Sequence, residues 1–422
     1  MHLQPTNASD VAIAGSGAPG AGDLNHNLLK EIRMRPKGST VSAGELTILP
    51  SFTVRVSPVG LITMGKKFLQ GMDANVKLWS GVVTVFAKSG NYVAQLDDVE
   101  LDPVDLAFRI VIDGDLRDQV RRSAVVLASA GREQAEVADV CFDEGVPCAY
   151  VTELSLSTRL QIVFAKTRNP LLKARRALWE WRTERRMLRA LARSAGAQCN
   201  GTPTYRNYRQ RTQDTILFFD SRSSIESMAT DDQIESRAAE MLSGGPLRLV
   251  FSGRLVAIKG ADHLIAVARH LTLRGFNFTL KIAGDGHLKD EILRNVGTMP
   301  IELLGVLEFQ TQLTPLLRSS CDLFVCCHRQ GDPSCTYLET MAAGVAIVGY
   351  DNEAFRGLAE LSGSGWIVSK DRPDLLAEAI TRITREEIKD ASFRARNFAR
   401  EHSMEAEFAR RIEHLQRLSR SS

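Results

Sequence analysis

The feature that most constrains the fold of this chain is an alternation of short β-branched runs with longer segments of helical spacing. The alternation begins near Glu45. Strands that alternate with helical segments form parallel sheets joined by crossover helices. We therefore expect an α/β fold whose first series of strands is 46–52, 82–87, 106–112, 124–128, 147–151 and 216–219.

A second series of expected strands follows, at 248–252, 279–283, 301–304, 323–326, 345–349 and 365–368. The two series are separated by a polar stretch that ends in Ser243-Gly244-Gly245-Pro246, a strong structure-breaking cluster. A chain of 422 residues also exceeds what one hydrophobic core usually supports. Two α/β domains are therefore predicted, with a ligand in the crevice at the carboxyl ends of their strands.

These patterns predict five segments. Residues 1–43 are rich in Gly, Ala, Ser and Asn without periodicity and are interpreted as a disordered leader. The N-terminal domain is expected over 44–222, a linker over 223–246 and the second domain over 247–400. Residues 401–422 are expected to form a C-terminal helix that packs on the N-terminal domain.

Charge and cysteine usage limit the partners and the compartment. Lys+Arg 53 against Asp+Glu 50 gives a net charge of +3, which is too small a surplus to indicate a nucleic-acid partner. The seven cysteines show no CxxC spacing, which favours a reduced, cytosolic compartment. No run of 18 uncharged apolar residues and no signal peptide is found, so we expect a cytoplasmic protein, either free or at the inner face of the plasma membrane.

The first strand of the second series leads into Gly253-Arg254-Leu255, and Lys259-Gly260 then opens an apolar helix. Two cations beside the free N–H groups of a helix start form a pocket for a diphosphate. The alternative, to which we give equal weight, is that both cations are solvated loop residues. The next strand ends in a tight Gly284 to Gly286 turn, which permits close approach of a ligand.

A third turn follows the strand at 323–326. Gly331-Asp332-Pro333-Ser334 leads into a helix with Ser334 as a candidate N-cap, and its N–H groups could face an anion. Glu339, about one and a half turns into that helix, could accept hydrogen bonds from ribose hydroxyls. Cys326-Cys327-His328 lacks a second ligand pair, so we prefer core cysteines to a metal site there and expect no metal.

Taken in order, these motifs resemble a known family. Gly-Arg-Leu-x3-Lys-Gly, Gly-Asp-Gly, the turn at Gly305 and Leu-Glu-x-Met-Ala-x-Gly-x-x-Ile/Val are similar to the nucleotide-sugar domain of retaining glycosyltransferases of family 4, the group 1 transferases. The resemblance covers 247–383. It implies the GT-B fold: two Rossmann-like doubly wound domains facing a cleft, the acceptor domain first, with a C-terminal helical return.

The resemblance also implies an activity: transfer of a sugar from a nucleotide-diphosphate sugar to a hydroxyl acceptor with retention, without metal or another cofactor. Arg254 and Lys259 match the family's diphosphate-binding pair, and Glu339 matches its ribose-binding glutamate. The family's first glutamate is replaced by Gly331. Either Asp332 and the N–H groups of the turn contact the donor sugar instead, or sugar recognition is altered, or activity is lost.

The first domain offers fewer signals. Glu153 follows the strand 147–151 and is the candidate acid–base group, although an N-cap or first-turn role in the next helix is at least as plausible. Asn200 begins a strand–turn–helix segment with Thr202 as N-cap and Pro203 at N1, which we interpret as structural or cleft-lining.

Gly60 is a candidate for the glycine-rich loop that transferases of this architecture keep near the donor phosphates. Lys66 and Lys67 follow it, and we favour solvated helix residues over phosphate ligands for both.

The most basic stretch is 171–195, a cationic amphipathic helix that contains Trp179 and Trp181. Such a helix can lie on an anionic lipid surface, or it can be an ordinary surface helix whose apolar stripe packs on the sheet. We weigh the two equally. The resemblance adds weight to the membrane interpretation, because many family members glycosylate lipid-linked acceptors at the cytoplasmic face.

The sequence thus predicts a glycosyltransferase with a glycan or lipid-linked glycan acceptor, and the resemblance suggests a role in bacterial surface polysaccharide or exopolysaccharide assembly. Two alternatives stay open. A nucleotide-sugar epimerase can share the architecture and would alter the donor without an acceptor. A non-catalytic nucleotide-sugar or glycan-binding protein would fit the missing first glutamate.

Overall fold

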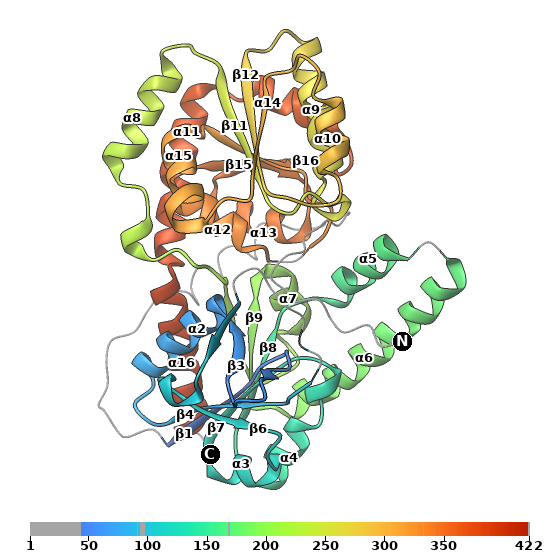
Figure 1. Cartoon of the computed structure of the whole chain (residues 1–422), viewed down its shortest axis with the longest axis vertical. Coiled ribbons are helices and arrows are strands. Elements are labelled where there is room, and N and C mark those ends of the chain that lie inside the picture. Colours follow the sequence, from blue (N-terminus) through green and yellow to red (C-terminus); the bar gives the residue numbers. More distant parts are fainter. Residues whose placement is uncertain (1–43, 91, 93–97, 168, 332, 421–422) are drawn as a thin grey trace.

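The computed structural model describes residues 44–90, 92, 98–167, 169–331 and 333–420. The predicted leader, 1–43, lies outside the described residues. The described chain forms two α/β units, one above the other in Figure 1, each built on a parallel sheet with helices on both faces.

The N-terminal unit contains a seven-stranded parallel sheet of order β10-β9-β8-β7-β1-β4-β6. Its strands are β1 Glu45–Leu49, β4 Val83–Ala87, β6 Arg109–Ile112, β7 Ser123–Ser129, β8 Cys148–Thr152, β9 Gly196–Asn200 and β10 Asp214–Phe218. β1 is fully paired on both sides and lies at the centre of the sheet, so its side chains Leu46 and Ile48 are buried. Six of these strands overlap strands of the predicted first series, and β9 was not predicted.

The helices of this unit are α2 Lys66–Leu78, α3 Leu116–Arg122, α4 Val137–Asp143, α5 Leu156–Lys166, α6 Pro170–Arg193 and α7 Gly201–Tyr208. A small antiparallel sheet lies beside them, formed by β2 Arg55–Val56, β3 Ile62–Gly65 and β5 Asp98–Leu101. Thr202 is inside α7, whose N-cap is Asn200, so the prediction of Thr202 as N-cap is wrong. The chain turns into α7 at Gly201, which has a positive φ of 72°, so the helix begins two residues before Pro203, the position expected for N1.

The C-terminal unit contains a six-stranded parallel sheet of order β13-β12-β11-β14-β15-β16. Its strands are β11 Leu247–Ser252, β12 Phe278–Ala283, β13 Ile301–Gly305, β14 Leu323–Cys326, β15 Ala346–Tyr350 and β16 Gly365–Val368. Each overlaps a predicted strand of the second series. Its helices are α8 Asp231–Leu242, α9 Ala261–Leu273, α10 Lys289–Asn295, α11 Thr314–Ser320, α12 Cys335–Ala342, α13 Glu353–Ser362, α14 Pro373–Arg382 and α15 Arg385–Glu401.

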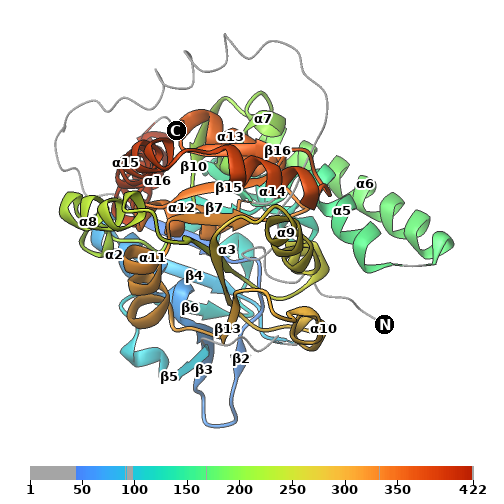
Figure 2. The same cartoon turned by 90° about the horizontal axis from the view of Figure 1, so that it is seen from above.

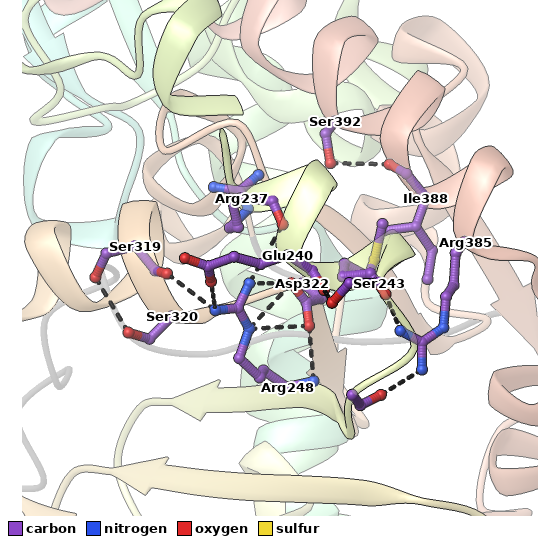
Figure 3. A network of polar contacts seen from close by, with 12 residues as sticks. Arg237, Glu240, Ser243, Arg248, Ser319, Ser320, Asp322, Arg385, Ile388 and Ser392 are labelled. Carbon is purple, nitrogen blue, oxygen red and sulfur yellow. Dashed lines mark hydrogen bonds and ion pairs between the residues drawn. The ribbon is translucent and has the colours of Figure 1, made fainter. Parts of the chain in front are cut away.

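The segment predicted as a linker, 223–246, contains helix α8, which packs against α11 and α15 of the C-terminal unit. Figure 3 shows the polar network that fixes it. Arg248 of β11 bonds Glu240 of α8 at 2.5 Å and the buried Asp322 at 2.8 Å, while Arg237 donates to the carbonyl of Arg318 at 2.9 Å. Charge-assisted bonds of this kind hold α8 on the C-terminal sheet.

Helix α16, Met404–Arg420, returns along the molecule to the N-terminal unit (Figure 1). It packs against α2, β7 and β10. Its buried residues Ile412, Leu415 and Leu418 join the apolar cluster that includes Leu46 and Val125 of the N-terminal sheet. None of the described helices is long and apolar enough to cross a membrane.

Each sheet has a topological switch point, where neighbouring strands lead to crossovers in opposite directions. In the C-terminal sheet it lies between β11 and β14, and in the N-terminal sheet between β1 and β7. Ligands of doubly wound sheets bind at the carboxyl ends of the strands at such points.

Candidate functional site

The predicted cation pair lies at the C-terminal switch point, after β11. Arg254 is exposed, whereas Lys259 is 2% exposed and its Nζ is 3.4 Å from Ser334 Oγ. Gly260 allows the chain to pass close to the loop after β14. Its φ is 66°, and a Cβ there would lie 1.9 Å from the carbonyl oxygen of Cys327. The turn after β11 thus directs Lys259 towards the loop after β14.

The glycine turns pack on one another. Gly284 has a φ of 133°, and a Cβ at this position would lie 2.0 Å from the carbonyl oxygen of Gly253. The Gly286 backbone also lies close to Leu255, because a Cβ at Gly286 would be 2.5 Å from the Leu255 carbonyl oxygen. The three glycines therefore bring the ends of β11 and β12 together and leave backbone, rather than side chains, at this edge.

Two buried polar side chains lie beside Lys259. His328 Nε2 has no hydrogen-bond partner among the described residues, and both amide atoms of Gln330, which is 2% exposed, also lack one. Burial and the nearby Lys259 hold the pKa of His328 well below its usual range, so the imidazole is neutral. Native proteins leave few buried polar groups unsatisfied, so a ligand or water is expected at these atoms.

Glu339 is paired in this structure. Its Oε1 accepts a hydrogen bond of 2.7 Å from Arg222 Nε, and its side chain is 5% exposed. Arg222 comes from the segment between the units, and its guanidinium lies 4.3 Å from the centre of the Phe309 ring. A ribose bound at Glu339 would have to share or displace Arg222.

The turn before α12 contacts the N-terminal unit. Thr158 Oγ1 of α5 donates to the Gly331 carbonyl at 3.0 Å. Gly201 lies against Pro333, where a Cβ would be 2.7 Å from the Pro333 Cβ. Ser334 is the N-cap residue of α12, as predicted, but its side chain makes no capping bond. Asp332 lies outside the described residues.

A charged cluster joins the two units. Lys67 Nζ of α2 is 2.5 Å from Asp220 Oδ2, which follows β10, and 3.0 Å from Cys335 Sγ at the start of α12. Burial alone would lower the pKa of Lys67, but Asp220 and Cys335 raise it well above its ordinary value. Lys67 is therefore a charged interdomain contact, and our preference for a solvated helix residue is wrong. Lys66 is exposed, as expected.

Glu153 lies next to this cluster. Its Oε2 accepts a hydrogen bond of 2.9 Å from Asn200 Nδ2, and Asn200 Oδ1 accepts one of 3.1 Å from the Asp220 backbone N–H. Burial, then the charge of Asp220, raises the pKa of Glu153. Burial would also raise the pKa of Asp220, but Lys67 and Arg411 lower it overall. Two neighbouring carboxyls thus have pKa values moved in opposite directions, a pattern typical of acid–base sites.

The structural alternative for Glu153 does not hold, because α5 begins at Leu156 and its N-cap is Ser155. Gly60 lies in the exposed turn between β2 and β3 and is absent from the lining of a cavity beside the cluster.

That cavity has a volume of about 260 Å³ and lies at the N-terminal switch point. Its lining includes the carboxyl ends of β1 and β7, with Lys67, Glu153, Asp220 and Arg411 at its polar side. The two switch points therefore each have a candidate binding region, and the charged cluster lies between them.

Several of these residues were missed from the sequence. Asp220, Arg222, Gln330 and Arg411 were not singled out, and Arg411 comes from α16 at the far end of the chain. The neighbourhood of Asp220 is set by long-range contacts, since it meets residues 153 and 115 positions away. A local signal existed only for Gln330, one residue before the Gly331 that departs from the family pattern.

Among the residues that the structure describes, no group of three or more His, Cys, Asp and Glu side chains could hold a metal ion. All seven cysteines are free and buried. Cys326 and Cys327 lie in the core, as expected from the sequence.

Comparison with known families and curated proteins adds to this geometry. Residues 232–400 match the family of glycosyl transferases group 1. An alpha-D-kanosaminyltransferase of Streptomyces kanamyceticus is 27% identical over 160 residues, which are 36% of this chain and 41% of that protein. The match thus spans less than half the length of this relative. The residues that match the family model lie in the C-terminal unit.

Solved structures are similar in fold over about nine-tenths of the chain. Anabaena HepE in complex with UDP is similar with a TM-score of 0.60 and 14% identity, over 89% of this chain and 99% of that chain. Sucrose-phosphate synthase from Thermosynechococcus elongatus is similar with a TM-score of 0.59 and 12% identity, over 90% of this chain and 100% of that chain. The predicted GT-B fold is therefore confirmed.

Proposed function

We propose that this chain is a retaining glycosyltransferase that moves a sugar from a nucleotide-diphosphate sugar to a hydroxyl acceptor. The bond between the anomeric carbon and the phosphate oxygen breaks, a bond to the acceptor oxygen forms, and the acceptor gives up its proton. The main support is that each unit has a switch point, that contacts such as Lys67 to Cys335 join the two units near them, and that the C-terminal unit is similar to the group 1 family.

The donor phosphates are proposed to bind at Arg254 and Lys259. Cations there offset the negative charge that grows on the leaving diphosphate, and a cation that is already buried and oriented needs no reorganisation during the reaction. A third cation is near, since burial and then the charge of Arg254 lower the pKa of Lys166 at the end of α5. Gly253, Gly284 and Gly286 allow the close approach, and UDP in the HepE complex fits a donor of this class.

The donor sugar is proposed to lie between the loop after β14 and the Glu153 cluster. Gln330 and His328 have unsatisfied buried polar atoms in that loop, and these atoms are the proposed contacts to the sugar. Retention without a protein nucleophile fits a front-face mechanism in which the leaving diphosphate assists deprotonation of the acceptor. Glu153 is the proposed protein acid–base group, and the remaining residues position the reactants.

A thermal-shift panel tests the donor assignment. UDP, GDP, ADP, TDP and their common sugar conjugates are measured with wild type, Glu339→Ala and the control Glu291→Ala, which is exposed on α10. A ligand that binds only the folded state raises the melting temperature. We expect one nucleotide series to stabilise wild type and the control but not Glu339→Ala; stabilisation by no series would argue for the non-catalytic alternative.

Independence from metal is a further part of the proposal. Arg254 and Lys259 supply positive charge at the diphosphate, so transfer should persist at full rate after treatment with EDTA. Loss of transfer that added Mg²⁺ or Mn²⁺ restores would contradict this part alone. A role in bacterial surface polysaccharide or exopolysaccharide assembly stays a prediction from the resemblance.

We also propose that α6 contacts an anionic membrane. The N-terminal part of α6 projects away from the body with α5 (Figures 1 and 2). Leu171, Leu178, Trp179 and Trp181 are exposed there, while the buried residues of α6 lie mainly in its C-terminal half. Exposed tryptophan and leucine beside many arginines suit the boundary between headgroups and acyl chains.

Flotation with liposomes that contain anionic lipid tests this contact. Arg175, Arg182, Arg186 and Arg189 are changed to Gln together, and the control changes the exposed Arg269, Arg274, Arg294 and Arg382 of the C-terminal unit. We expect salt-sensitive flotation of wild type and control that the α6 variant loses. Absence of flotation of wild type at low salt would refute the contact.

A further inference from the structure

The cavity at the N-terminal switch point has two chemically different sides. One side is apolar and includes the rings of Phe52 and Phe68, whereas the rings of Phe218 and Phe408 lie beside the Arg411 guanidinium, 4.4 and 5.2 Å from it. Phe52 and Phe68 pack edge to face, with ring centres 4.8 Å apart. The other side holds Lys67, Glu153, Asp220 and Arg411. A ligand that fits both sides has an apolar part and a polar part.

The dimensions limit the apolar part to about the size of one ring. The cavity volume is about 260 Å³. An apolar cavity of about 150 Å³ is enough to bind benzene, and sites for drug-sized ligands begin at about 300 Å³. A ring with one or two substituents therefore fits, whereas a disaccharide would extend into the cleft.

The polar side fixes the orientation. Asp220 contacts Cys335 of the C-terminal unit, with Cys335 Sγ 3.5 Å from Asp220 Oδ2, so this side of the cavity faces the donor domain. Asn200 bridges Glu153 and the Asp220 backbone and holds both carboxyl-bearing residues in place. A hydroxyl on the ligand would meet these carboxyls, while its apolar ring would lie against the phenylalanines.

We propose that this cavity binds the acceptor by an apolar ring or ring-sized apolar segment, with the hydroxyl to be glycosylated beside Glu153 and Asp220. The acceptor class is thus an aryl or alicyclic alcohol, or a larger molecule that ends in one, rather than a plain sugar. Glycosylation of the hydroxyl rests on the proposed transferase function. Binding of the ring in the cavity is independent of that function.

Binding is tested first, without a donor. Benzyl alcohol and cyclohexanol are the ring probes, and glucose and glycerol are the polar probes, each measured by saturation-transfer NMR on the full chain. Gly71 of α2 lines the cavity, and a Cβ there would lie 3.1 Å from the Phe408 ring. Gly71→Leu fills the cavity, and Leu is favoured over Gly within a helix. Gln70→Leu, exposed on the same helix, is the matched control.

We expect the ring probes to bind wild type and Gln70→Leu, and to bind Gly71→Leu at least about tenfold more weakly because the added side chain occupies their volume. If Gly71→Leu fails to fold, as judged by circular dichroism, Phe68→Ala replaces it and should weaken the ring probes by removing an apolar wall. Equal binding of ring and polar probes, or ring binding unaffected by the variants, overturns the proposal.

Transfer is tested next, with the nucleotide sugar that stabilises the protein. Benzyl and cyclohexyl glycosides, detected by mass spectrometry, should form with wild type and Gln70→Leu, and their yield should fall with Gly71→Leu. Transfer to polar acceptors alone, unchanged in Gly71→Leu, would overturn the acceptor class and leave the transferase function intact. Ring binding without any donor binding would instead refute the transferase function.

Discussion

At the scale of single residues, Lys259 is a buried cation for which one weak hydrogen bond, 3.4 Å to Ser334 Oγ, is recorded. A buried charge with few partners costs stability, and such a cost is often found at functional sites. We expect Lys259→Met to lower turnover by about 10²–10³-fold, as the loss of a preorganised charge does elsewhere. The melting temperature should be unchanged or higher. The control is Lys370→Met, which is exposed, and near-normal turnover of Lys259→Met would refute the assignment.

Glu153 makes a pH-dependent prediction. Its pKa is raised above the ordinary 4.5 by burial and then by Asp220, so the folded protein favours the protonated carboxyl. The stability from this proton is full below pH 4.5 and is lost as the pH rises through the raised pKa. Glu153→Gln imitates the protonated form and can keep the bond from Asn200.

The melting temperature of Glu153→Gln, measured by calorimetry, should therefore be higher than that of wild type at pH 8 and equal to it at pH 4. If Glu153 takes the proton from the acceptor hydroxyl, kcat/KM of wild type should rise with pH above 4.5. Glu153→Gln should lose this acidic limb of the pH profile. Glu133→Gln, exposed after β7, is the control. An unchanged acidic limb in Glu153→Gln would exclude the base role and leave only a positioning role.

At the scale of elements, the strands of the C-terminal sheet could be predicted because they are short apolar runs, of which β11 and β12 end before the turn residues Gly253 and Gly284. The same runs located the glycine turns that follow β11 and β12. Helix α8 was missed because its polar sequence resembles a linker, and its attachment depends on Arg248 and Asp322, which are 74 positions apart. Likewise, Lys67 meets Cys335 across 268 positions, so no local pattern could reveal the cluster.

Helix α16 shows that one element can stabilise a distant unit. Leu415 is fully buried and belongs to the apolar cluster of the N-terminal sheet. Leu415→Ala should reduce the free energy of unfolding by about 2–5 kcal/mol, through lost apolar burial and the cavity that remains. Amide exchange should increase in β1 and β7 rather than in β11 and β14. Glu413→Ala, exposed on the same helix, is the control; faster exchange only in the C-terminal sheet would contradict the packing.

At the scale of the whole molecule, the two units are in contact across the cleft. Thr158 bonds Gly331 at 3.0 Å, Lys67 bonds Cys335, and helix α7 packs on α13. Small residues permit the last contact, since a Cβ at Gly357 would lie 2.6 Å from the Thr202 Cβ. These contacts bring the cavity of the N-terminal unit next to the C-terminal unit, and in the proposed transferase such closure would exclude water from the reacting groups.

Gly357→Leu should act as a wedge between the units. Its side chain has no room against Thr202, so the domains must separate or α13 must shift. We expect a larger radius of gyration by small-angle X-ray scattering and a fall in kcat greater than the change in nucleotide affinity, because Arg254, Lys259 and Glu339, the main proposed nucleotide contacts, lie in the C-terminal unit. Adding Thr202→Gly removes the obstructing side chain and should restore both the radius and kcat. If Gly357→Leu keeps the wild-type radius of gyration and loses nucleotide binding, the substitution has damaged the C-terminal unit locally. That result would contradict the view that the contact between α7 and α13 controls closure of the two units.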